Sequence, residues 1–204
     1  MKHLSKPKTP THRAVASVRI IGGTHKRSLL PVLDAPGLRP TGDRIRETLF
    51  NWLGQDLSGW RVIDAFSGSG ALGFEAASRG AVDVLLVEAS APLAQSLTQT
   101  AERLKLSKVV RVERTDALAL LAREVGRGWD GVFVDPPFSQ IGEGVFEQAL
   151  AAVGKVISAR GWCYLEAPRA WQDDELAALG WRLSKQGKAG SVHFHLLEPL
   201  SSAV

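Results

Sequence analysis

The stretch VIDAFSGSGALGFEAASRG, residues 62–80, decides the fold class of this chain. It joins an apolar, strand-like run to an alanine-rich, helix-like run, with the glycine pattern G-x-G-x-x-G between them. In a doubly wound α/β domain, the turn after the first strand is where nucleoside ligands bind. Gly68 and Gly70 would let backbone amides approach such a ligand, and Gly73 would let the helix pack closely on the strand. By itself the pattern also fits a turn that serves packing alone.

The rest of the chain after Trp60 alternates in the same way. Short apolar runs, typical of buried parallel strands, are RVIDAF, VDVLLVE, KVVRVE, WDGVFVD and GWCYLEA. Helix-like stretches separate them, at about 70–79, 91–105, 116–125 and 143–157. The segment GWRLSKQGKAGSVHFHLLEP, 180–199, predicts an antiparallel hairpin that closes the sheet. We therefore expect one α/β domain over residues 55–204, with a mostly parallel, seven-stranded sheet covered on both faces.

The first 54 residues predict a small N-terminal extension. Residues 1–16 resemble a disordered basic arm, and residues 17–54 a hairpin with a basic turn followed by a helix. The helix lies in GLRPTGDRIRETLFNWLG, 37–54, where Thr41 or Asp43 would cap its start and Gly54 would end it. The basic residues of this extension make it a candidate surface for binding a polyanion.

Charge is distributed unevenly along the chain. Residues 1–46 hold ten Lys and Arg against two Asp and Glu, a net charge of +8, whereas the remainder has a net charge of −4. This asymmetry indicates a polyanionic partner, nucleic acid first, although a solvated basic tail is the alternative. The sequence has no long apolar run or signal peptide, and its one cysteine, Cys163, cannot form an internal disulfide. These features predict a cytoplasmic protein without a membrane span.

Acidic residues follow the first three strands of the predicted sheet. Asp64 precedes the glycine turn, where a carboxylate would repel a pyrophosphate but attract a cation. S-adenosylmethionine combines an adenosine with a sulfonium and an ammonium group, so it fits better than a dinucleotide. Glu88 is placed to bind ribose hydroxyls, and Asp116 to bind an adenine amino group. Backbone capping is the alternative for Asp64 and for Asp116, and it excludes neither role.

The fourth strand ends in Asp135-Pro136-Pro137-Phe138. Two prolines make this corner stiff and leave carbonyl groups without local partners. The Asp135 carboxylate and the Pro136 carbonyl could accept hydrogen bonds from an exocyclic amine, while Phe138 stacks on the base. A proline-rich strand exit with a core phenylalanine is the structural alternative.

These segments together resemble a known family. DPPF is similar to the fourth motif of methyltransferases that act on amino groups of nucleic-acid bases, and DAFSGSGALGFEA is similar to their S-adenosylmethionine loop. More narrowly, the chain resembles the RsmD family, bacterial class I methyltransferases that modify the exocyclic N2 of a guanine in 16S ribosomal RNA, at a site of the guanine-966 type. The other segments that carry this resemblance are RIIGGTHKRSLLPV, GLRPTGDRIRETLFNWL, the pair VE at 87–88, and VFVDPPF. Gly42 departs from the expected polar residue, and residues 1–16 lie outside the resemblance.

The resemblance implies a Rossmann-like fold and a role for each matching residue. Asp64, Gly68, Gly70, Glu88 and Asp116 would bind S-adenosylmethionine, and Asp135, Pro136 and Phe138 would hold the flipped guanine. The partner would be 16S ribosomal RNA or an assembling small ribosomal subunit, bound by a monomer. Phosphate contacts are expected from the basic side chains of the extension: Arg19, Lys26, Arg27, Arg39, Arg44 and Arg46. Arg44 and Arg46 could instead order the donor loop.

Three rival functions stay open at the level of sequence. An adenine-N6 methyltransferase acting on DNA or another RNA fits the same tetrapeptide. A dinucleotide oxidoreductase fits the glycines but leaves Asp64 and the Pro-Pro corner unexplained. A noncatalytic RNA-binding module would not need the Asp135 corner. His193 and His195 alternate on one strand, so at most one faces inward, and no spacing of His or Cys indicates a metal site.

Overall fold

The computed structural model describes residues 14–34, 41–137, 142 and 144–200. The N-terminal part forms β1 (Ala14–Arg19), β2 (Leu29–Leu33) and α1 (Asp43–Trp52). Alternating strands and helices follow: β3 (Arg61–Asp64), α2 (Ala71–Ser78), β4 (Asp83–Val87), α3 (Ala91–Arg103), β5 (Val110–Glu113), α4 (Ala117–Arg123), β6 (Trp129–Val134), α5 (Val145–Val156) and β7 (Ile157–Ala167). The chain continues with α6 (Asp173–Ala178), β8 (Trp181–Ala189) and β9 (Val192–Pro199).

Seven of the described strands form one sheet in the order β5-β4-β3-β6-β7-β9-β8. Strands β3 to β7 pair in parallel, whereas β9 pairs antiparallel with both β7 and β8. The predicted fold class, a mostly parallel seven-stranded sheet with a C-terminal antiparallel hairpin, is therefore confirmed. Because the chain runs outward from β3 to β5 and then returns to β6, the switch point of the sheet lies between β3 and β6.

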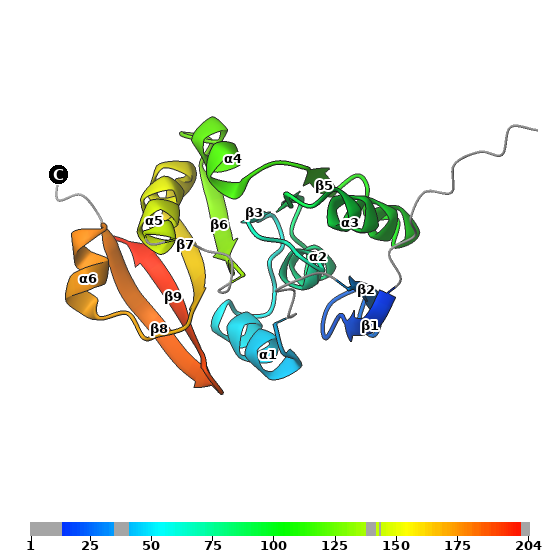
Figure 1. The fold of residues 1–204 in the computed structure, drawn as a ribbon, viewed down its shortest axis with the longest axis horizontal. Helices are drawn as coiled ribbons and strands as arrows, with labels where there is room; N and C mark the ends of the chain where they lie inside the picture. Colours follow the sequence, from blue (N-terminus) through cyan, green and yellow to red (C-terminus); the bar gives the residue numbers. More distant parts are fainter. Residues whose placement is uncertain (1–13, 35–40, 138–141, 143, 201–204) are drawn as a thin grey trace, which may run out of the picture.

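Helices cover both faces of the sheet (Figure 1). One core packs the β1–β2 hairpin and helices α1, α2 and α3 against one face. The other core packs α4, α5 and α6 against the opposite face. Helix α2 is buried on all sides, which explains why its sequence is nearly all apolar or small. Helix α6 is a short helix of six residues that the sequence pattern did not predict.

The N-terminal extension differs from its prediction in two details. Strand β1 begins at Ala14, inside the segment expected to be a disordered arm, and residues 1–13 lie outside the described part of the chain. Helix α1 has Gly42 as its N-cap, without a side-chain cap. The expected cap from Thr41 or Asp43 is therefore wrong, because the Thr41 hydroxyl donates to Asp135 and the Asp43 carboxylate pairs with Arg46. None of the described helices is long and apolar enough to span a membrane.

Candidate active site

The acidic residues predicted from the sequence lie along one edge of the sheet. Asp64 ends β3, Glu88 directly follows β4, and Asp135 directly follows β6. Because these strands are parallel, their carboxyl ends meet at the same edge, on either side of the switch point between β3 and β6. The sequence placed these groups on separate strands, and the sheet order brings them together.

The glycine turn is shaped by its own backbone and by Glu88. Gly68 and Gly70 have φ angles of 52° and 76°, a region that glycine adopts without strain. The Gly68 amide donates to the Glu88 carboxylate over 3.0 Å, so the residue that follows β4 holds the glycine turn that follows β3. Burial raises the pKa of Glu88, although its bonds to backbone amides oppose that shift. A Cβ at Gly73 would lie 2.2 Å from Leu86 Cδ2, which confirms that this glycine allows close packing of helix on strand.

Asp64 lies beneath the glycine turn and holds the start of α2. One of its carboxylate oxygens accepts a hydrogen bond from the Gly73 amide over 3.0 Å, so the expected backbone contact is present. The residue is only 2% exposed. Burial raises the pKa of Asp64 to about 7, with smaller contributions from the charges of Asp135 and Glu88. A ligand that brings positive charge to this edge would favour the ionised carboxylate.

Asp116 is the N-cap of α4. Its carboxylate accepts from the Ala119 amide over 3.0 Å, which confirms the capping contact that the sequence offered. The residue is exposed, so the cap does not bury the carboxylate.

The Asp135 corner is held by a residue from the N-terminal extension. The Thr41 hydroxyl donates to one Asp135 oxygen over 2.9 Å, across 94 residues of sequence. Pro136 is buried and Pro137 is partly exposed, so the corner is packed into the sheet edge. Burial raises the pKa of Asp135 to about 6, and the Thr41 hydrogen bond opposes the shift. Phe138, the predicted stacking residue, lies outside the described residues.

Sequence reasoning missed Glu166 and its partner Tyr164, near Asp135. Strand β7 pairs with β6 so that Leu165 lies opposite Val134, which puts Glu166 one step beyond, next to Asp135. Glu166 is 3% exposed and accepts from the Tyr164 hydroxyl over 2.8 Å. Burial raises the pKa of Glu166 to about 8, and the neighbouring Asp135 adds to the shift. The sequence did contain a signal for Glu166: it is an acidic residue near the carboxyl end of GWCYLEA, the next predicted strand after the one that ends at Asp135.

Arg46 departs from the expected role in RNA binding. Its guanidinium is completely buried. It donates to the Glu75 and Asp43 carboxylates over 3.3 and 2.6 Å and to the carbonyls of Arg19 and Thr41 over 2.9 and 3.2 Å. A guanidinium with these partners has no surface left for a phosphate, so we correct the expectation for Arg46: it joins α1 to α2 and to β1.

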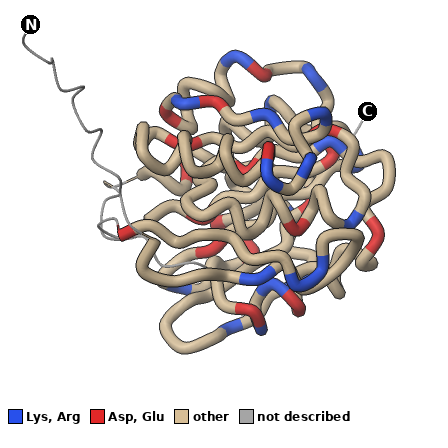
Figure 2. The backbone as a smooth tube through the Cα atoms, turned by 90° about the vertical axis from the view of Figure 1, so that its right-hand side faces the viewer, with Lys and Arg blue, Asp and Glu red and all other residues tan. Residues whose placement is uncertain are grey.

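The remaining basic candidates lie in two places. Arg19 pairs with Asp43 over 3.3 Å but keeps 63% of its side chain exposed, and Arg44 is exposed on the first turn of α1. Lys26 and Arg27 are exposed on the hairpin loop, which packs on the last residues of α2 through contacts of Gly22, Thr24 and His25 with Ser78. Basic and acidic positions are interspersed along the backbone on this side of the molecule (Figure 2). Arg39 lies outside the described residues.

The acidic edge of the sheet has no basic partner among the described residues. None of the ion pairs among the described residues includes any of these four carboxyl groups: Asp64, Glu88, Asp135 and Glu166. Buried acidic groups without a cation are costly unless they stay protonated or a ligand supplies positive charge. The edge therefore fits a nucleoside that carries positive charge better than one that carries a pyrophosphate.

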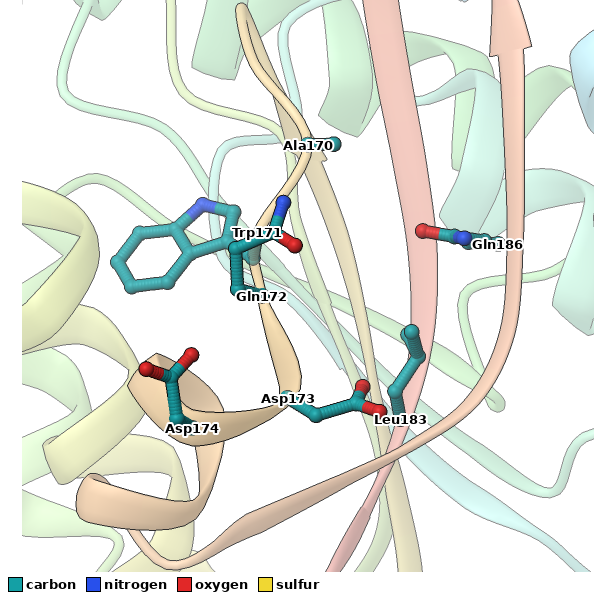
Figure 3. A pocket seen from close by; sticks show the side chains of 7 residues that line it. All are labelled: Ala170, Trp171, Gln172, Asp173, Asp174, Leu183 and Gln186. Atoms are coloured by element: carbon teal, nitrogen blue, oxygen red, sulfur yellow. The ribbon is translucent and has the colours of Figure 1, made fainter.

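The described residues also form a polar hollow away from this edge (Figure 3). It lies between the segment that joins β7 to α6 and strand β8, and Gln172, Asp173 and Gln186 are among its lining residues. The Trp171 indole points away from Gln186 in this view, so the ring does not fill the hollow. None of the predicted site residues lines it.

Comparisons with known proteins agree with this geometry. The model of the family described as "Conserved hypothetical protein 95" matches residues 18–198. Ribosomal RNA small subunit methyltransferase D of Escherichia coli strain K12 is 37% identical over 196 residues, which cover 94% of each chain. The chain belongs to this family. The enzyme of the same name from Haemophilus influenzae is 35% identical over 195 residues, covering 94% of this chain and 98% of the relative.

Solved structures extend the comparison to the fold. The yhhF protein of Escherichia coli superposes with a TM-score of 0.76 at 31% identity, covering 90% of this chain and 98% of the other. Magnesium protoporphyrin IX methyltransferase of Synechocystis, solved with S-adenosylmethionine bound, has a TM-score of 0.61 at 18% identity, covering 76% and 77%. The second likeness shows a shared fold, and the resemblance to the RsmD family predicted from the sequence is confirmed.

Proposed function

We propose that this RsmD-family protein transfers a methyl group to the exocyclic N2 of a guanine in 16S ribosomal RNA, at a site of the guanine-966 type. The observation that carries the proposal is the Asp135-Pro136-Pro137 corner, where Thr41 binds one oxygen of Asp135 at the switch point of the sheet. Ribosomal RNA methylation is supported by the names of relatives that match nearly the whole chain. The cytoplasmic location and the monomeric state stay predictions.

The cofactor is S-adenosylmethionine, and the described residues fit it. Its sulfonium and ammonium groups would supply the positive charge that the acidic edge lacks. Glu88, at the end of β4, would bind the ribose hydroxyls, and Asp116 the adenine amino group. Gly68 and Gly70 would let the turn approach the nucleoside closely, because neither glycine carries a side chain.

The chemistry needs an amine with an available lone pair. When bound, S-adenosylmethionine supplies the methyl group: the nitrogen–carbon bond forms as the carbon–sulfur bond breaks, and the sulfonium becomes a neutral thioether. The N2 lone pair of guanine is delocalised into the ring, so the amine is a weak nucleophile. The Asp135 carboxylate and the Pro136 carbonyl would accept its two hydrogens in tetrahedral directions, which localises the lone pair. Positioning of this kind supplies much of the acceleration in such reactions.

The amine must also lose one proton. Asp135 is the nearest acceptor in this arrangement, and its raised pKa makes it a better base than an exposed aspartate. The proton then passes to solvent, because Asp135 is only partly buried. No covalent enzyme intermediate is required.

Replacing Asp135 by alanine tests this assignment. Asp135→Ala should lower kcat by about 100-fold or more, because it removes the acceptor that aligns the amine. The measurement is transfer of labelled methyl groups to small-subunit RNA from a strain that lacks the protein, with the product nucleoside identified by mass spectrometry.

Asp130→Ala is the matched control, because Asp130 lies at the other end of β6, where it accepts from the Arg61 amide over 2.7 Å. It should leave kcat within a few-fold of the wild type. Near-normal turnover of Asp135→Ala would refute the catalytic assignment. Formation of N6-methyladenosine in place of N2-methylguanosine would favour the alternative adenine-N6 methyltransferase.

A further inference from the structure

A line of hydrogen-bonding groups leads from Asp135 into the protein interior. The Thr41 hydroxyl donates to Asp135 over 2.9 Å, and the register of β6 and β7 puts Glu166 next to Asp135, where Thr41 lowers the pKa of Glu166. The Tyr164 hydroxyl donates to the other side of Glu166 over 2.8 Å. These groups come from three separate parts of the chain: the segment before α1, the end of β6, and β7.

The number of hydrogen atoms that these groups can donate determines how many of the two carboxyl groups, Asp135 and Glu166, are ionised. Thr41 carries a single hydroxyl hydrogen, so it cannot satisfy two carboxylates at once. If one carboxyl keeps a proton, that group can donate to the Thr41 oxygen while Thr41 donates to the other carboxylate. One proton shared by the pair therefore satisfies every group, whereas two ionised carboxylates would face each other in a buried place.

The surroundings place this proton on Glu166. Glu166 is 3% exposed, and burial and the charge of Asp135 raise its pKa to about 8, whereas the pKa of Asp135 is raised to about 6. On β9, Phe194 lies opposite Glu166, so the neighbouring His193 and His195 point to the other face of the sheet. On α1, the buried Arg46 donates to the Thr41 carbonyl, not to either carboxyl. Asp64 adds another acidic group beside Asp135.

We propose that Thr41 and Glu166 are positioning residues for the methyl transfer: Glu166 holds one proton and donates toward Thr41, and Thr41 donates to one oxygen of Asp135. The second oxygen of Asp135 is then left to accept from the target amine. Only one negative charge remains in the line, and it lies on the residue that faces the substrate. This inference rests on the proposed role of Asp135 and extends it to two residues that do not touch the amine.

The proton balance follows from this arrangement. The proton on Glu166 stays in place throughout a turnover, and the proton lost by the amine goes to Asp135 and then to solvent. At high pH, Glu166 loses its proton, and the two carboxylates compete for the single hydrogen of Thr41. The alignment of Asp135 is then lost, so kcat should fall on the alkaline side with the loss of one proton.

The pH profile of kcat tests the inference. In the wild type, kcat should decline as the pH rises above about 8. Glu166→Gln should keep kcat at pH 7 within about three-fold of the wild type and should lack this alkaline decline, because the amide donates to Thr41 at every pH. Tyr164→Phe should move the decline to higher pH, because the lost hydroxyl stabilises the ionised form of Glu166.

Thr41 is tested by a pair of substitutions. Thr41→Val should lower kcat by about ten-fold or more, and Thr41→Ser should restore most of it, because only the hydroxyl is needed.

Glu124→Gln is the matched control for Glu166→Gln: Glu124 is 6% exposed and accepts from the Trp129 indole over 3.0 Å, away from Asp135. It should leave the pH profile unchanged. Binding of S-adenosylmethionine and thermal unfolding would show that each variant is folded.

The outcomes separate the two proposals. If Asp135→Ala is active, the proposed function fails. If Asp135→Ala is inactive but Glu166→Gln keeps the alkaline decline of the wild type, only the present inference is overturned. Should the Glu166 variant not fold, infrared spectroscopy of the Asp64→Asn protein still decides, because this protein lacks the other carboxyl group that holds a proton near pH 7. A protonated carboxyl band at pH 7 that fades as the pH rises through about 8 is expected, and its absence at pH 7 contradicts the shared proton.

Discussion

At the scale of single residues, the site is built from carboxyl groups whose protonation depends on burial. Asp64 shows the effect most clearly, because it ends a central strand, accepts one backbone hydrogen bond and has no basic partner among the described side chains. The same carboxyl group therefore supports the glycine turn and responds to the charge of a ligand. Glu166, two strands further along the sheet, is likewise buried and has a raised pKa.

The raised pKa of Asp64 gives a prediction for stability. The folded protein holds this proton up to a pKa of about 7, while the unfolded chain loses it near 3.8, the usual pKa of an aspartate. Between these values the folded state binds more protons, so the free energy of unfolding contributed by Asp64 falls as pH rises. Asp64→Asn should remove this dependence and be relatively more stable above pH 7, by at most about 4 kcal/mol.

Urea unfolding of both proteins from pH 4 to pH 8 measures this difference. S-adenosylmethionine should reduce it, because a cationic ligand favours the ionised Asp64 of the wild type. Parallel stability curves for the two proteins over the whole range would show that Asp64 is not protonated in the folded state.

At the scale of elements, a buried acidic side chain joins the N-terminal extension to the sheet domain. Glu75, in the middle of α2, accepts from the backbone amides of Ile21 and Gly22 over 2.8 and 2.7 Å. It also pairs with Arg46 and Arg79, and its side chain is completely buried. The hairpin β1–β2 and helix α1 therefore dock on α2 through one carboxylate. Since α1 is preceded by Thr41, this junction also positions the group that binds Asp135.

Removing Glu75 should cost much more than removing a surface acid. Glu75→Ala breaks buried ion pairs with Arg46 and Arg79 and leaves two partly buried amides without their acceptor, so the free energy of unfolding should fall by about 3–5 kcal/mol. Glu113→Ala breaks an exposed ion pair with Arg123 and should cost less than about 1 kcal/mol. Urea titration checks both values, and equal losses would contradict the role assigned to Glu75.

At the scale of the whole molecule, the basic residues of the hairpin loop lie away from the acidic edge of the sheet. The hairpin loop with Lys26 and Arg27 packs on the carboxyl end of α2, whereas the glycine turn and Asp64 lie at its amino end. The eight residues of α2 span about 12 Å. An RNA that contacts both places must therefore cross one side of the molecule.

The loop should then influence binding without influencing the chemical step. The double variant Lys26→Ala, Arg27→Ala should lower the salt dependence of RNA binding, reducing the slope of log K against log salt by about 1.5. At saturating RNA its kcat should equal that of the wild type, because the loop lies away from Asp135. The control Arg123→Ala, Lys155→Ala removes the same charge from α4 and α5 on the opposite layer. An unchanged slope for the loop variant would exclude these phosphate contacts.

The sequence by itself determined the strands, most of the helices and the separate site residues. Period and composition sufficed for β3, β4, β6 and the second half of β7, because a strand buried on both faces is apolar along most of its length. They also predicted the glycine turn and placed Asp64, Glu88 and Asp135 at strand ends. These features depend on neighbours in the chain, which a sequence displays directly.

Only the tertiary structure decided how these residues meet. The local sequence pattern predicted that Thr41 caps a helix, but in the fold its hydroxyl donates to Asp135. Arg46 was expected to bind a phosphate, but in the fold it is buried and donates to Glu75. Glu166 lies next to Asp135 because the register of β6 and β7 sets Val134 opposite Leu165. Each of these contacts joins residues 29 or more positions apart. A side chain with two available partners takes the one that the packing of the sheet brings within hydrogen-bonding distance, and sequence spacing does not contain that distance.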